Sequence, residues 1–67
     1  MKRLKKLDGL RIHDTVLVKD GLNEFYATVH SLLRDGVMVR ARRSDRDGTL
    51  VPVYEKNLLE YEVWIDE

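Results

Sequence analysis

Arginine is concentrated in one short part of the chain, VMVRARRSDRDGTLVPV. Planar guanidinium groups on a bent sheet can hold a phosphate or a carboxylate through paired hydrogen bonds. Because alternate residues of a strand point to the same side, Arg40 and Arg42 are predicted to project outward beside Met38. The neighbouring turns add further arginines at Arg34, Arg43 and Arg46. The stretch therefore predicts either a cationic binding surface or the solvated face of a small sheet.

Three interpretations of this surface are open from the residues. With Tyr26 and His30 on the outward side of the preceding strand, the arginines could bind DNA or RNA and stack its bases. They could also hold an acidic protein, or pair with Asp45, Asp47 and the C-terminal glutamates as an ordinary solvated face. A basic segment at the start of the chain could support the nucleic-acid interpretation through Lys2, Arg3, Lys5 and Lys6.

The remaining reactive residue types form no recognisable catalytic or metal-binding pattern. His13 and His30 are the two histidines, and a metal site needs three or four suitably spaced ligands, so both are expected to be structural. Ser31 and Ser44 have no nucleophile context, and the sequence has no glycine-rich phosphate loop. We therefore expect no enzyme activity, no metal and no cofactor.

Charge is distributed unevenly along a chain whose formal net charge is +0. Residues 1–46 carry eleven Lys and Arg against six Asp and Glu, whereas residues 47–67 carry one Lys against six acids. A neutral total argues against long-range attraction of nucleic acid, although a one-sided patch can still bind it. The chain has no cysteine and no apolar run near the roughly 18 residues of a membrane span. These features favour an intracellular protein, cytoplasmic or nuclear, with no membrane partner.

The elements that must position these residues are short strands. Residues 1–10 form a basic N-terminal arm in which Leu4 and Leu7 have helical spacing, but the nine residues up to Gly9 are too few for a stable free helix. From His13 onward, apolar residues alternate with polar ones in five segments, the first four of which are separated by Asp-Gly turns. A single helical turn is expected at EKNLL, before the last strand. Because a bent, partly closed barrel removes most strand edges at this size, residues 11–67 are predicted to form an all-β, five-stranded barrel.

The segments HDTVLVKDGLNEFYATV, GVMVRA and DGTLVPV resemble the Tudor-like, or more broadly SH3-like, small β-barrels over residues 12–61. The resemblance implies the fold and gives little information about a ligand. Tudor domains that bind methylated side chains use a cage of aromatic rings. Tyr26 matches one wall of that cage, but Ala41 and Ser44 stand where two others would be. The resemblance therefore does not extend to the reading of methyl marks.

The leading functional prediction is a non-enzymatic interaction module that binds a protein or peptide, and a homodimer is one form that such binding can take. Trp64 is out of phase with its inward neighbours, so it is either an outward interface anchor or a ring covered by Leu4, Leu7 or Leu10. The predicted partner surface consists of Tyr26, His30, Met38, Arg40, Arg42 and Trp64. The alternative is a nucleic-acid-binding barrel that uses Lys2, Arg3, Lys5, Lys6, Arg34, Arg40, Arg42, Arg43 and Arg46.

Overall fold

The chain folds into a single antiparallel sheet in the computed structural model, which describes residues 1–42 and 48–66. Within those ranges the strands are β1 (Lys2–Arg3), β2 (Thr15–Asp20), β3 (Asn23–Leu33), β4 (Gly36–Ala41), β5 (Leu50–Tyr54) and β6 (Tyr61–Ile65). Their order across the sheet is β1-β6-β2-β3-β4-β5, which leaves β1 and β5 as the two edges. The predicted all-β class is confirmed.

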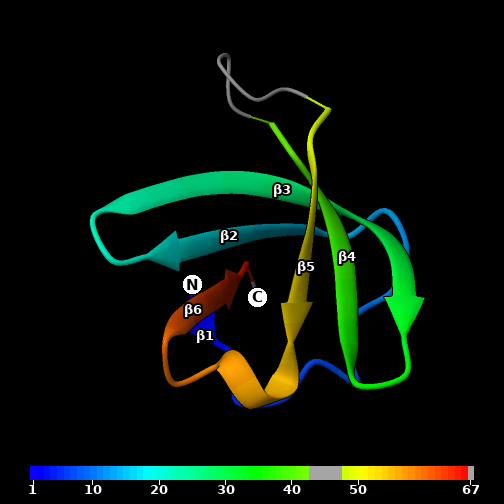
Figure 1. Ribbon diagram of the computed structural model, residues 1–67, viewed down its shortest axis with the longest axis horizontal. Coiled ribbons are helices and arrows are strands. Elements are labelled where there is room, and N and C mark those ends of the chain that lie inside the picture. The colour runs from blue at the N-terminus through cyan, green and yellow to red at the C-terminus, as the bar shows by residue number, and fades with distance from the viewer. Residues whose placement is uncertain (43–47, 67) are drawn as a thin grey trace.

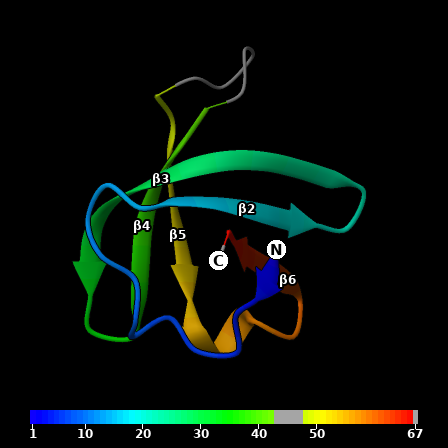
Figure 2. The same ribbon diagram turned by 180° about the vertical axis from the view of Figure 1, so that it is seen from behind.

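The described residues hold six strands where the sequence predicts five. The additional strand, β1, pairs Lys2 with Ile65 and Arg3 with Trp64, and the Leu4 amide donates to the Val63 carbonyl over 2.8 Å. Figure 2 shows β1 beside β6, with the two ends of the chain close together. A strand of two residues is too short to show alternation. The sequence of this segment therefore does not predict the strand, which is defined by its pairing with β6.

Strand β3 is long and curved, and it connects the two halves of the sheet (Figure 1). Its first part pairs with β2 from Asn23 to Thr28, and a later part pairs with β4 from Ala27 to Leu33. The register with β4 shifts between Val29 and Ser31, which marks a β-bulge. Because a bulge bends its strand and increases the twist, β3 can pair with β2 along its first part and with β4 along a later part that runs in a different direction.

Tight turns lie at two of the three Asp-Gly pairs that follow the predicted strands, and the third falls partly outside the described residues. Gly21 follows Asp20 at the β2–β3 turn with φ of 61°, a conformation that glycine adopts without steric cost. The β3–β4 turn closes with Leu33 opposite Gly36, directly after Asp35. Gly48 has φ of 88°, whereas Asp47 lies outside the described residues. The helical turn expected at EKNLL is present as a 3-10 turn over Glu55–Asn57.

The core lies inside the bend of the sheet and consists largely of valine. Its most deeply buried side chains are Val16, Val29, Val37, Val39, Val53 and Val63. The N-terminal segment contributes Leu7 and Leu10, which are 3% and 5% exposed. Burial of each such leucine stabilises the fold by about 1.5–3 kcal/mol. These two leucines therefore hold the N-terminal segment against the bent sheet.

Strand β4 begins at Gly36, where β5 approaches closely. A Cβ atom at this position would meet the Val53 carbonyl oxygen and lie 2.8 Å from Tyr54 Cα. Because backbone atoms cannot move aside as a flexible side chain can, only glycine fits here. This close approach sets the position of β4, the strand that carries Arg40. In the part of the chain that the structure describes, no helix has the length and apolar character needed to cross a membrane.

Candidate functional site

Residues on the outer side of β3 and β4 form one continuous surface. Thr28 lies opposite Arg40 in the register, and the Arg42 amide donates to the Tyr26 carbonyl over 2.9 Å. These outward residues alternate with buried ones, since Ala27 is 0% exposed and Ala41 is 1% exposed. We call this surface the open face and define it as Tyr26, Thr28, His30, Met38, Arg40 and Arg42. The outward projection predicted for Arg40 and Arg42 is thus confirmed by their exposure and by the register.

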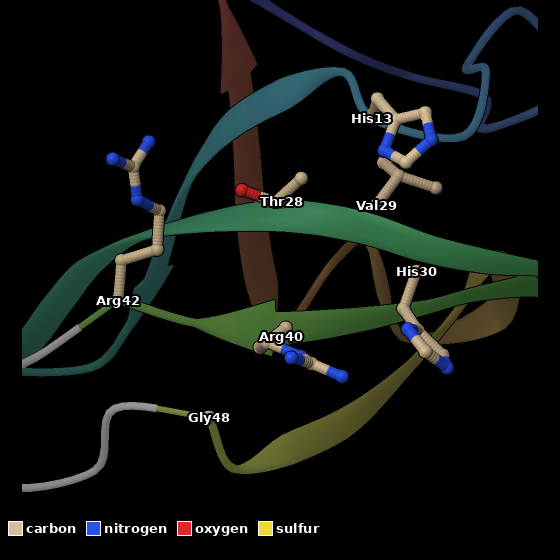
Figure 3. Close-up of a pocket in the computed structure, with 7 residues that line it drawn as sticks. All are labelled: His13, Thr28, Val29, His30, Arg40, Arg42 and Gly48. Atoms are coloured by element: carbon tan, nitrogen blue, oxygen red, sulfur yellow. The ribbon is translucent and has the colours of Figure 1, made fainter.

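The open face contains a hollow of about 480 Å³, lined by His13, Thr28, Val29, His30, Arg40, Arg42 and Gly48. In Figure 3, Arg40 extends toward His30, whereas Arg42 extends away from both. Two arginines and two histidines are thus among the residues that line one shallow space, and no carboxylate is among its described lining residues. Such a space attracts an anion, because all its charged groups have the same sign.

His13 enters the hollow from the segment before β2. Its amide donates to the Val29 carbonyl over 2.9 Å, and the Val29 amide donates to the Asp14 carbonyl over 2.8 Å. Its φ is 81°, in the left-handed region that residues other than glycine seldom occupy. Holding it there costs about 1 kcal/mol or more. The neighbouring Asp14 carboxylate accepts from the Arg11 amide over 2.9 Å, so it is engaged in its own turn.

The sequence does not identify His13 as a site residue, because two histidines are too few for a metal site and its position at the start of the first alternating segment gives it no partner. Its place beside His30 comes from hydrogen bonds to β3, which no local pattern reveals. Among the described residues, no group of three or more His, Cys, Asp or Glu side chains is arranged to hold a metal ion. The guanidinium groups of Arg40 and Arg42 also make the hollow unfavourable for a cation.

Arg40 and Arg42 are exposed, and no carboxylate within residues 1–42 and 48–66 forms an ion pair with either. Two described acids of the C-terminal part, Glu55 and Glu62, have hydrogen-bond partners elsewhere. Glu55 accepts from the Leu7 amide over 3.4 Å, and Glu62 accepts from the indole Nε1 of Trp64 over 3.1 Å. Strand β6 is separated from β4 by β2 and β3. The proposed pairing of the arginines with the C-terminal glutamates is therefore not found in the described residues, and Asp45 and Asp47 lie outside them.

Trp64 belongs to a second outward surface, on β2, β6 and the start of β3. Lys19 Nζ lies 5.1 Å from the centroid of the Trp64 ring and 3.9 Å from Glu24 Oε2. In the register, Lys19 stands between Glu24 and Glu62, and Leu17 stands between Trp64 and Tyr26. We call this surface the paired face and define it as Leu17, Lys19, Glu24, Glu62 and Trp64.

Leu17 points outward and is nevertheless only 6% exposed. Its cross-strand neighbours Trp64 and Tyr26 flank it on the same side of the sheet. Large rings at these two positions can shield the Leu17 side chain from water. Leu7 and Leu10, which the sequence offers as a cover for Trp64, are instead in the core cluster. Trp64 is half-buried and acts as part of the cover over Leu17.

The other cations of the nucleic-acid prediction are spread over the molecule. Lys2 and Arg3 are on β1, at the opposite edge of the sheet from β5, and Arg3 Nη2 donates to the Leu58 carbonyl over 3.2 Å. Lys5 and Lys6 are exposed on the segment that follows. Arg34 occupies the β3–β4 turn, away from Arg42 at the other end of β4. Arg43 and Arg46 lie outside the described residues. The structure thus brings Arg40 and Arg42 together and separates them from the other described cations of this prediction.

Comparisons with protein-family models, with curated proteins and with solved structures find no match for this chain. The resemblance to Tudor-like and SH3-like barrels therefore stays a prediction made from the residues. The function has to be inferred from the geometry of the open face itself, where two arginines and two histidines border one hollow.

Proposed function

We propose that this chain binds nucleic acid through the open face. The observation that carries the proposal is the hollow bordered by Arg40, Arg42, His13 and His30, in which no carboxylate is among the described lining residues. Since neither arginine has an ion-pair partner within residues 1–42 and 48–66, their hydrogen-bond donors are not taken up by any described carboxylate. A guanidinium group can donate two parallel hydrogen bonds to a phosphate, which makes phosphate a well-matched ligand for this surface.

The spacing of the arginines suits a chain of phosphates. Arg40 is near the end of β4 and Arg42 directly follows that strand, so their Cα atoms lie about 7 Å apart in extended backbone. That separation is comparable with the distance between successive phosphates of an extended nucleic-acid strand. A chain with formal net charge +0 gains little from long-range attraction, so the affinity must come from these local interactions. Binding is therefore expected to be modest and to weaken steeply with salt.

The proposal includes the finer fold, an SH3-like barrel in residues 11–67. It is supported by five strands from β2 to β6 in the described residues, by the strong bend of β3 and by the 3-10 turn immediately before β6. Small barrels of this kind bind ligands on outward strand faces, and the open face is such a surface. An intracellular location, where nucleic acid is available, is part of the same proposal.

A protein or peptide partner stays a prediction from the sequence. Five of its six predicted residues are on the open face, and Trp64 is on the paired face. An acidic peptide would compete for the same guanidinium groups, so it serves as the comparison ligand in the test. A carboxylate and a backbone phosphate each present two anionic oxygens to a guanidinium group, so the two ligands differ in the spacing of their charges and in the bases that only nucleic acid carries.

The test measures fluorescence anisotropy of a labelled single-stranded oligonucleotide of about 12 nucleotides at increasing salt, with a labelled oligoglutamate in parallel. We expect nucleic acid to bind more tightly than oligoglutamate. Replacing Arg40→Ala and Arg42→Ala together should reduce the slope of log affinity against log salt by about 0.7 for each phosphate that the variant no longer binds. The matched control removes two positive charges elsewhere, through Lys5→Ala and Lys56→Ala. No binding at low salt, or an equal loss in the control, contradicts the proposal.

A further inference from the structure

Among the phenylalanine, tyrosine and tryptophan side chains in the part of the chain that the structure describes, only Tyr26 is exposed, with 54% of its surface accessible. The other described rings are at least half-buried or engaged. Lys19 lies over Trp64, Lys56 Nζ lies 5.7 Å from the centroid of Tyr54, and Phe25 packs against the core. Exposure of an aromatic ring to water is unfavourable, and the ring becomes useful when a planar ligand covers it.

The backbone holds Tyr26 directly beside the phosphate-binding groups proposed above. The hydrogen bond from the Arg42 amide to the Tyr26 carbonyl, 2.9 Å long, places the two residues side by side on β3 and the end of β4. The next outward pair along the same strands is Thr28 and Arg40. On the other side of Tyr26, its cross-strand neighbour is Leu17, which is 6% exposed. Tyr26 thus lies on β3 with the apolar Leu17 on one side and the cation Arg42 on the other.

This combination distinguishes between forms of nucleic acid. In a duplex the bases are stacked on one another, so a protein reaches mainly the phosphates and the groove edges. In a single strand the bases are free, and each has a flat surface that an aromatic ring can cover. An aromatic ring flanked by arginines can therefore stack on a base of a single strand, whereas a duplex presents no such base.

We propose that the open face binds single-stranded nucleic acid, with one base stacked on Tyr26 and the adjoining phosphates held by Arg42 and Arg40. This inference rests on the proposed function, and it adds the form of the ligand and the residue that selects it. Stacking tolerates any base, so binding is expected to show little sequence preference. The ring binds the base, and the arginines fix the path of the backbone.

The test compares three proteins, the wild type, Tyr26→Phe and Tyr26→Leu, against labelled oligo-dT, oligo-rU and a duplex of equal length. Tyr26→Phe keeps the flat ring, and its affinity for the single strands should stay within about twofold of the wild type. Tyr26→Leu keeps an apolar neighbour for Leu17 but removes the ring, and its affinity for single strands should fall about fivefold or more. The salt slope should be the same in all three, because the phosphates are still bound.

The duplex separates this inference from the proposed function. We expect the wild type to bind the single strands more tightly than the duplex, and neither variant to change duplex binding. If single strand and duplex bind equally and Tyr26→Leu has no effect, the stacking inference is overturned while the proposed function stands. If neither form binds at low salt, the proposed function itself fails. Circular dichroism and Trp64 fluorescence establish that each variant is folded, and Tyr26→Thr, which also removes the ring from the strand, replaces Tyr26→Leu if that variant is not.

Discussion

The open face and the paired face lie on the same side of one sheet and follow the same alternation of residues, yet their charges are arranged in opposite ways. On the paired face, Lys19 stands between Glu24 and Glu62 in the register and covers the Trp64 ring. On the open face, Arg40 stands opposite Thr28, and Arg42 stands next to Tyr26. Within the described residues, one surface satisfies its own charges, and the other leaves two cations for a ligand.

This difference shows that strand register decides which charged residues are available for binding. A count of charges does not reveal it, because the chain has 12 Lys and Arg and 12 Asp and Glu. Lys19 on β2 forms an ion pair with Glu24 on β3 and stands opposite Glu62 on β6, while β4 has β3 and β5 as its neighbours. Neither neighbour presents a carboxylate opposite Arg40, since its partners are Thr28 and Leu50.

The largest expected effect comes from reversing the charge of the open face. Arg40→Glu combined with Arg42→Glu should lower the affinity for single-stranded nucleic acid about 100-fold or more, because two charge-assisted interactions become repulsions. Anisotropy at low salt measures the change. Lys5→Glu combined with Lys56→Glu alters the net charge equally and should have a much smaller effect. If both double variants lose affinity to the same extent, the comparison between the two faces does not explain binding.

The next effect concerns the paired face and is one of stability. Trp64→Ala should destabilise the fold by about 2 kcal/mol, because Leu17 loses its cover. The cost is smaller than for a fully buried tryptophan, since Trp64 is only half-buried. Urea unfolding followed by circular dichroism measures this change. Trp64→Phe keeps a ring over Leu17 and serves as the control. An unchanged unfolding midpoint for Trp64→Ala would show that the ring does not cover Leu17.

A smaller effect is expected at His13, where stability and binding should change in opposite directions. His13→Gly should raise the free energy of unfolding by up to about 1 kcal/mol, because glycine adopts a positive φ without strain. The same variant should bind nucleic acid less tightly, since the hollow loses one hydrogen-bond donor. His13→Asn tolerates the same backbone and gives a second measurement of both quantities. A loss of stability together with unchanged affinity would show that His13 takes no part in binding.

The smallest effect is expected from Lys19→Ala. Lys19 Nζ and Glu24 Oε2 are 3.9 Å apart, and the two side chains are 37% and 63% exposed, so water reaches the pair. Such a pair contributes about 0.5 kcal/mol or less to stability. The affinity for nucleic acid should change by less than about twofold, because Lys19 is on the paired face and binds no phosphate in this account. A tenfold loss of affinity would show that the paired face also takes part in binding.

Local patterns predict most of the strands and turns. The alternation around Val16 and Val18 identifies the inward side of β2, and the Asp-Gly pairs mark the turns, because both depend on residues close in sequence. The strand Lys2–Arg3 is not predictable in this way, since its partner residues Trp64 and Ile65 lie at the other end of the chain. Pairing across that separation leaves no trace in the short segment itself.

The site is predictable in part for the same reason. The outward direction of Arg40 and Arg42 follows from alternation, and that of Trp64 follows from its phase against Val63. Whether each charge is neutralised depends on strand order, which the alternation does not contain. His13 is missed because hydrogen bonds with β3, rather than a repeat in its own segment, bring it to the hollow.

The most direct test of the account is a nuclear magnetic resonance titration of the labelled protein with a single-stranded oligonucleotide. The amide signals of Tyr26, Thr28, His30, Arg40 and Arg42 should shift as the ligand is added. The indole Nε1 signal of Trp64, which is hydrogen-bonded to Glu62, should stay in place. Shifts concentrated on Trp64 and β1, with the signals of β3 and β4 unmoved, would contradict the assignment of binding to the open face.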